Sequence, residues 1–128
     1  MMNENVGRLI LRLLLGILML FHGINKLTGG IGSISNAVTG AGLPAFVAYG
    51  VYLGEVIAPL LIIAGWYSRV GAILIAVTMI FAVGLVHSAD VFALNKAGGW
   101  AIELQGLYLF AGIAAALLGP GRFSINSK

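Results

Sequence analysis

The segment FVAYGVYLGEVIAPLLIIAG, from Phe46 to Gly65, decides how this chain folds. It is about as long as the roughly 20 apolar residues that cross a bilayer as a helix. Near its middle lies one acidic residue, Glu55. A charge at the bilayer centre costs roughly 2.5–3.5 kcal/mol on insertion scales, so such a residue faces protein or trapped water and marks a candidate site. The segment therefore predicts a spanning helix with a buried carboxylate.

Pro59 follows Glu55 by one helical turn. A proline has no amide hydrogen, and its ring clashes with the carbonyl four residues earlier in a helix. That carbonyl belongs to Glu55, so the sequence predicts a kink and a freed carbonyl beside the acid. This combination makes Glu55 the candidate proton-handling residue.

The composition is that of an integral membrane protein. Of the 128 residues, 60% are hydrophobic and 9% are charged, whereas a soluble domain has about 25% charged residues. The net charge of +3 comes from few groups, and no basic stripe is interleaved with aromatic residues, so a nucleic-acid partner is excluded. The chain has no cysteine, which excludes thiolate catalysis, disulfide exchange and iron–sulfur ligation by this subunit.

Four apolar segments predict an all-α, four-helix transmembrane bundle that forms a single domain over residues 1–128. Isolated spans must be helices, because every backbone polar group in lipid needs an internal partner. The first helix is expected to be retained, since it lacks the small-x-small cleavage site of a signal peptide. The predicted spans cover residues 6–24, 46–65, 69–87 and 101–118.

The distribution of basic residues predicts that both termini are cytoplasmic. In that orientation five basic residues lie inside or near the inner surface, and Lys26 and Lys96 lie outside. The first outer loop, residues 25–45, has apolar residues at helical spacing, which predicts a short interfacial helix that ends near Gly40.

Polar side chains gather on one face of each predicted helix when residues are placed at 100° intervals. In the fourth span this places Glu103 on the inward stripe with Leu107 and Phe110, and turns Gln105 away. The outer halves of these faces predict a ligand-binding pocket between the helices, lined by His22, Lys26, Tyr52, Glu55, His87 and Glu103.

Two interpretations of these polar groups stay open. A buried carboxylate near histidines relays protons, and a quinone head group needs such a partner when its oxygens exchange protons. Alternatively, Glu55 pairs with Lys26, Arg12 or a histidine only to hold the bundle together. We assign structural or charge-pairing roles to Arg12, Pro59 and Arg69, and the two arginines are also placed to snorkel to the inner phosphates.

The two histidines, His22 and His87, have the residue type of axial haem ligands. Histidines at helix ends are, however, common hydrogen-bonding groups, and we favour that interpretation over haem. A metal site that combines them with Glu55 or Glu103 has no support from spacing. We therefore expect no metal site and no covalent cofactor, with a quinone as the candidate ligand.

Several short motifs resemble one known family. They are RLLLG and HGINK in the first span, GLP before the second, GE within it, GWYSR after it, HS at the end of the third, and GPGRFSIN at the end of the chain. Their order and spacing resemble the DoxX family of small four-helix bacterial membrane proteins. The matching positions are Arg12, Gly16, Gly23, Lys26, Glu55, Arg69, His87 and residues 119–122.

The resemblance implies a multi-pass protein of the bacterial inner membrane. Relatives in the broader group include the membrane subunit of a thiosulfate:quinone oxidoreductase, and others are associated with quinone or oxidative-stress detoxification. The first functional hypothesis is therefore a redox-linked subunit that binds a quinone or another small oxidisable molecule. The alternatives are a non-catalytic membrane adaptor, or a solute or proton permease that acts as an oligomer. The expected partners are the lipid bilayer and either a second copy of the chain or a redox partner subunit.

Overall fold

The computed structural model describes residues 2–86 and 88–126, and within them the chain is helical without any strand. A single isolated bridge between Leu94 and Trp100 is the only strand-like pairing in that part of the chain. The all-α prediction is confirmed.

Three long helical stretches and one shorter helix make up the bundle. The second stretch is composite, because 3-10, α and π turns follow one another without a break. The elements are α1 (Met2–Gly29), α2 (Gly32–Gly40), η1 (Ala45–Tyr49, 3-10), α3 (Gly50–Tyr52), η2 (Leu53–Ile57, π), α4 (Ala58–Ala64), α5 (Ser68–Val86), η3 (Ser88–Asp90, 3-10) and α6 (Glu103–Leu118).

The first helix, α1, is longer than the apolar run that predicts it. It continues through Lys26 to Gly29, because a helix that has formed adds one backbone hydrogen bond for each residue it gains, even beyond the apolar segment. Gly30, with φ of 81°, follows the helix in the left-handed region. The extension places the Lys26 side chain within the bundle.

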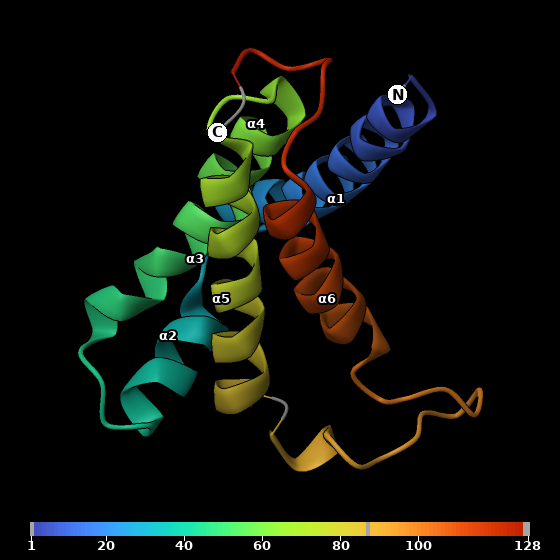
Figure 1. The fold of residues 1–128 in the computed structure, drawn as a ribbon. Helices are drawn as coiled ribbons and strands as arrows, with labels where there is room; N and C mark the ends of the chain where they lie inside the picture. The colour runs from blue at the N-terminus through green and yellow to red at the C-terminus, as the bar shows by residue number, and fades with distance from the viewer. Residues whose placement is uncertain (1, 87, 127–128) are drawn as a thin grey trace.

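The helix α5 lies in the middle of the bundle, with α4 and α6 packed against it, while α1 crosses behind them (Figure 1). Small residues allow these contacts: a Cβ at Gly112 of α6 would lie 3.0 Å from the carbonyl oxygen of Ala72, and a Cβ at Gly71 would lie 2.9 Å from that of Ala58. The buried core consists of Leu15, Met19, Ala58, Ile62, Ala72, Ile75, Met79, Tyr108 and Ala115.

The outer faces of the helices are apolar. Large hydrophobic side chains that point outward include Ile10, Leu14, Phe21, Ile73, Ile80, Leu107, Phe110 and Leu117. Contiguous exposed apolar surface of this kind is rare on soluble monomers. Three stretches are long and apolar enough to cross a membrane, namely 2–29, 45–64 and 68–85. These faces support the membrane assignment.

The predicted fourth span corresponds to α6, which is a shorter apolar helix. Its 16 residues extend over roughly 24 Å at 1.5 Å per residue, less than a hydrocarbon core of about 30 Å. The number of membrane crossings therefore stays a prediction.

The start of α1 and the C-terminal segment up to residue 126 lie at the same end of the bundle, together with the turn between α4 and α5 (Figure 1). This turn closes as a Schellman motif, in which Trp66 N–H donates to Leu61 O and Gly65 N–H donates to Ile62 O. Gly65 has φ of 71°, a conformation that other residues rarely adopt. The short helix predicted for the first outer loop is present as α2, at the opposite end of the bundle.

The buried side chain of Arg12 joins three parts of the chain at the terminal end of the bundle. Its guanidinium donates hydrogen bonds to the carbonyl oxygens of Ile62 (3.0 Å), Ile63 (3.1 Å), Pro120 (3.1 Å) and Phe123 (2.6 Å). The first two belong to the last turn of α4, where carbonyls lack the regular helical partner and, among the described residues, Ile62 O otherwise accepts only from the Gly65 amide. Arg12 therefore caps α4 and holds the C-terminal segment against it, and snorkelling to phosphates is not its role.

Candidate functional site

Glu55 lies on a π-helical turn rather than on an ordinary α-helix. The amide of Ala58 donates to the carbonyl of Leu53, five residues earlier, and Pro59 has no amide to donate to Glu55. Single π turns within helices occur frequently at functional sites. The sequence predicts a kink and a freed carbonyl beside Glu55, and the irregularity in the structure is a π turn, in which the backbone hydrogen bond spans five residues in place of four.

Two glycines let neighbouring helices approach this turn. A Cβ at Gly23 of α1 would overlap the carbonyl group of Glu55, and a Cβ at Gly54 would overlap the side chain of Thr78 on α5. The Thr78 hydroxyl donates to the carbonyl of Leu74 at 2.7 Å, so it is fixed in place. The turn that carries Glu55 is therefore clamped between α1 and α5.

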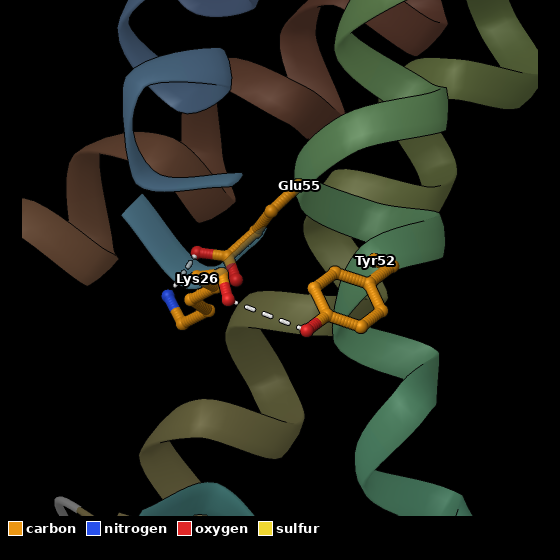
Figure 2. Close-up of polar contacts among 3 residues, drawn as sticks. All are labelled: Lys26, Tyr52 and Glu55. Carbon is orange, nitrogen blue, oxygen red and sulfur yellow. Dashed lines mark hydrogen bonds and ion pairs between the residues drawn. The ribbon is translucent and has the colours of Figure 1, made fainter. Parts of the chain in front are cut away.

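Lys26 and Glu55 form an ion pair, with 2.8 Å between Nζ and Oε1 (Figure 2). The Lys26 side chain is 21% exposed and that of Glu55 is 6% exposed. The hydroxyl of Tyr52 donates to the backbone carbonyl of Lys26 at 3.3 Å. These contacts join the end of α1 to α3 and η2, and they bring together three of the predicted site residues.

The second carboxylate oxygen of Glu55, Oε2, is enclosed by protein. Among the described residues no group donates a hydrogen bond to it. A buried acceptor without a donor costs about 1–3 kcal/mol, and more for a charged group. A buried oxygen of this kind calls for a donor that the described residues do not provide.

A cavity of about 680 Å³ adjoins the pair. Its volume falls within the range of small-molecule sites, which is roughly 300–1,000 Å³. Residues of α1, α2, η1, α3, η2, α5 and α6 line it, and most of them are apolar. The polar residues on its wall are His22, Lys26, Ser33, Glu55, Thr78, Gln105 and Tyr108.

Four of the polar wall residues were not among the predicted site residues, namely Ser33, Thr78, Gln105 and Tyr108. The ring of Tyr108 meets that of His22 edge to face, with 5.7 Å between centroids and 87° between planes. Residues 105, 108, 112 and 115 follow one another at helical spacing and so lie on one face of α6. Two of them, Gly112 and Ala115, are small, and small residues in such a row indicate the face by which a membrane helix contacts its neighbours.

The predicted inward stripe of α6 was wrong. Leu107 and Phe110 are 68% and 62% exposed, and Glu103 is an exposed residue at the start of the helix beside Gly99. Gln105, which was expected to point away, lies on the cavity wall. The packing of Gly106 against the Trp100 ring and of Gly112 against α5 sets the rotation of α6, and the positions of its polar residues do not.

The remaining predicted residues lie elsewhere. Arg12 does not reach Glu55, since its guanidinium is occupied by the backbone carbonyls of α4 and of the C-terminal segment. The exposed Arg69 packs its guanidinium against Gly119. His87 lies outside the described residues. Within residues 2–86 and 88–126, no group of three or more His, Cys, Asp or Glu side chains is placed to hold a metal ion.

Comparison with known proteins agrees with the helical, membrane-type fold. Over 110 residues the chain is 32% identical to "Putative oxidoreductase CatD" of Bacillus subtilis (strain 168), an alignment that covers 84% of this chain and 81% of that protein. No solved structure matches significantly. Residues 7–88, which include both members of the Lys26–Glu55 pair, match the DoxX family. The chain therefore belongs to the DoxX family.

Proposed function

We propose that this protein is a redox-linked subunit of the bacterial inner membrane that binds a quinone, its quinol or a similar small oxidisable molecule in the cavity beside Glu55. The observation that carries the proposal is the buried Glu55 carboxylate, which is paired with Lys26 on one oxygen, unsatisfied on the other, and part of the wall of a largely apolar cavity. The oxidoreductase name of the Bacillus subtilis relative supports it.

The cavity suits an amphiphilic ring. Apolar side chains from α5, such as Leu74, Val77 and Phe81, provide a surface for the ring and its substituents. Glu55, His22 and Tyr108 provide hydrogen-bonding groups for oxygens on the ring. Sites with mostly apolar walls and a few polar groups are typical of small organic ligands.

The proposed role of Glu55 is to exchange a proton with the bound molecule. Conversion between a quinone and its quinol takes two electrons and two protons. Carboxylates transfer protons in many enzymes when they lie within hydrogen-bond reach of the reacting oxygen. Because the chain has no cysteine, we assign electron transfer to a separate redox partner subunit, and this chain provides the binding site and the proton acceptor.

The experiment is a binding titration of the detergent-purified protein with a short-chain benzoquinone and with its quinol, kept reduced under anaerobic conditions. We expect at least one redox form to bind. Glu55→Gln should weaken that binding about tenfold or more, because a hydrogen bond to a charged group contributes about 1.5–3 kcal/mol.

Glu103→Gln is the matched control, because Glu103 is exposed and lies outside the cavity wall. It makes the same chemical change and should leave binding as in the wild type. Binding of neither redox form, or equal binding by wild type and Glu55→Gln, would refute the proposal.

A further inference from the structure

We infer that the cavity selects a ligand that presents a hydrogen-bond-donating hydroxyl to Glu55, so that a phenol or quinol binds in preference to the quinone of the same ring. The inference rests on the proposed function and names the chemical form of the ligand. It follows from which groups on the cavity wall are able to donate a hydrogen bond and which only accept one.

Glu55 acts only as an acceptor in this site. The ammonium group of Lys26, 2.8 Å from Oε1, stabilises the ionised carboxylate. An ionised carboxylate has no hydrogen to donate. A quinone carbonyl is also an acceptor, so it gains nothing from Glu55 and is repelled by its charge, whereas a hydroxyl on the same ring carbon donates to it.

The unsatisfied Oε2 atom increases this preference. It is enclosed in the present side-chain conformation and has no donor among the described residues. The terminal torsion of a glutamate side chain is soft, with a broad range of accessible angles. In the proposed complex, a modest rotation about it directs Oε2 toward the cavity, on whose wall Glu55 lies, and a ligand hydroxyl removes the cost of this buried oxygen without a donor.

The other polar residues on the wall discriminate less. Gln105, His22 and Tyr108 each have both donor and acceptor capacity, so they bind a carbonyl or a hydroxyl. Ser33 has a hydroxyl with the same dual capacity, whereas the Thr78 hydroxyl already donates to the carbonyl of Leu74 and has acceptor capacity left for a ligand. The ammonium of Lys26 only donates, and it is directed at Oε1 of Glu55, 2.8 Å away. The difference between the two redox forms of a ligand therefore falls on Glu55.

The test separates hydrogen-bond donation from redox chemistry. Isothermal titration calorimetry on the full chain in detergent compares four probes with one common ring: a short-chain benzoquinone, its quinol under anaerobic reductant, the corresponding monophenol, and the methyl ether of that phenol. The ether has a methyl group in place of the donor hydrogen of the phenol, and both compounds are redox-inert under these conditions. We expect the quinol and the phenol to bind at least about tenfold more tightly than the quinone and the ether.

Two variants assign the preference to the ion pair. Glu55→Gln replaces the acceptor-only group by an amide that both donates and accepts, so the ratio of phenol to ether affinity should fall toward one. Lys26→Met removes the cation, and a buried carboxylate without one becomes neutral and able to donate. The quinone should then gain affinity relative to the quinol. Lys96→Met is the control, since Lys96 is exposed and outside the cavity wall, and it should keep the wild-type ratio.

The outcomes separate this inference from the proposed function. Equal affinity of the wild-type protein for phenol and ether, with quinone and quinol both bound, overturns the inference and leaves the proposed function standing. Failure to bind any of the four probes overturns both. Circular dichroism checks that each variant is folded. If a variant does not fold, the phenol-to-ether ratio of the wild type decides by itself.

Discussion

The Nζ atom of Lys26 lies 2.8 Å from Oε1 of Glu55, so the last turn of α1 is bound to the π-helical turn of the second stretch. About a fifth of the Lys26 side chain is exposed, while the Glu55 side chain is almost fully buried. The pair thus connects an enclosed carboxylate to the edge of the bundle. Its contributions to stability and to ligand binding are separable by mutation.

A double-mutant cycle on this pair is the first prediction. Breaking a buried ion pair by removing one partner costs roughly 3–5 kcal/mol, whereas replacing both partners with apolar residues is often neutral. Since Lys26 is partly exposed, we expect Lys26→Met and Glu55→Leu each to lose less than that, about 1–3 kcal/mol. The double variant should recover most of the loss in thermal unfolding experiments in detergent.

Ligand binding should not recover in the double variant, because no carboxylate remains to accept a hydrogen bond. Titration with the quinol probe measures this. A double variant that regains both stability and binding would show that the pair serves helix packing alone.

The second prediction concerns the capping arginine. In Arg12→Met the carbonyls of Ile62, Ile63, Pro120 and Phe123 lose a charged donor in a buried place. We expect a loss of roughly 3 kcal/mol in stability, together with release of the C-terminal segment, which is detectable as faster proteolysis near Phe123. The exposed Arg122 provides the comparison, and Arg122→Met should unfold close to the wild-type temperature. Equal stability of the two variants would contradict the capping role.

The third prediction tests the close approach of α1 to the π turn. A Cβ at Gly23 would overlap the Glu55 carbonyl, so Gly23→Ala should cost about 1–3 kcal/mol and shift Glu55 away from its partner. Gly7 lies in the same helix with open space around it, and Gly7→Ala should be neutral or stabilising by up to about 1 kcal/mol. Thermal unfolding and quinol titration measure the two effects. A Gly23→Ala protein with unchanged stability and affinity would argue against the clamp.

The fourth prediction concerns orientation in the membrane. The chain has no cysteine, so single cysteines introduced at exposed positions report their own side. With both termini inside, Lys96→Cys should react with a membrane-impermeant maleimide on intact cells. Asn3→Cys should react only after lysis. Labelling of Asn3→Cys on intact cells would reverse the predicted orientation.

Much of the fold was predictable because lipid narrows the choices. Apolar runs of spanning length must be helices. The predicted boundaries of the second and third spans agree with the continuous stretch 45–64, from η1 to α4, and with α5 to within a residue or two in the part that the structure describes. The face of α1 that carries Arg12, Met19, His22 and Lys26 turns inward, because Gly16 and Gly23 beside it allow close approach to the second stretch. The predicted α6 stripe failed because only packing decides the rotation of a helix that is apolar on all sides.

The sequence by itself determined that this is a helical membrane protein with an irregular, acid-bearing second stretch, because burying a charge and placing a proline in a helix carry large local costs. The tertiary structure decided which cation meets Glu55. Arg12 and Lys26 share one face of α1, but the carbonyls at the end of α4 occupy Arg12 and leave Lys26 for the acid. It also decided the cavity, because α2, α5 and α6 enclose the space beside the pair only after the helices have packed.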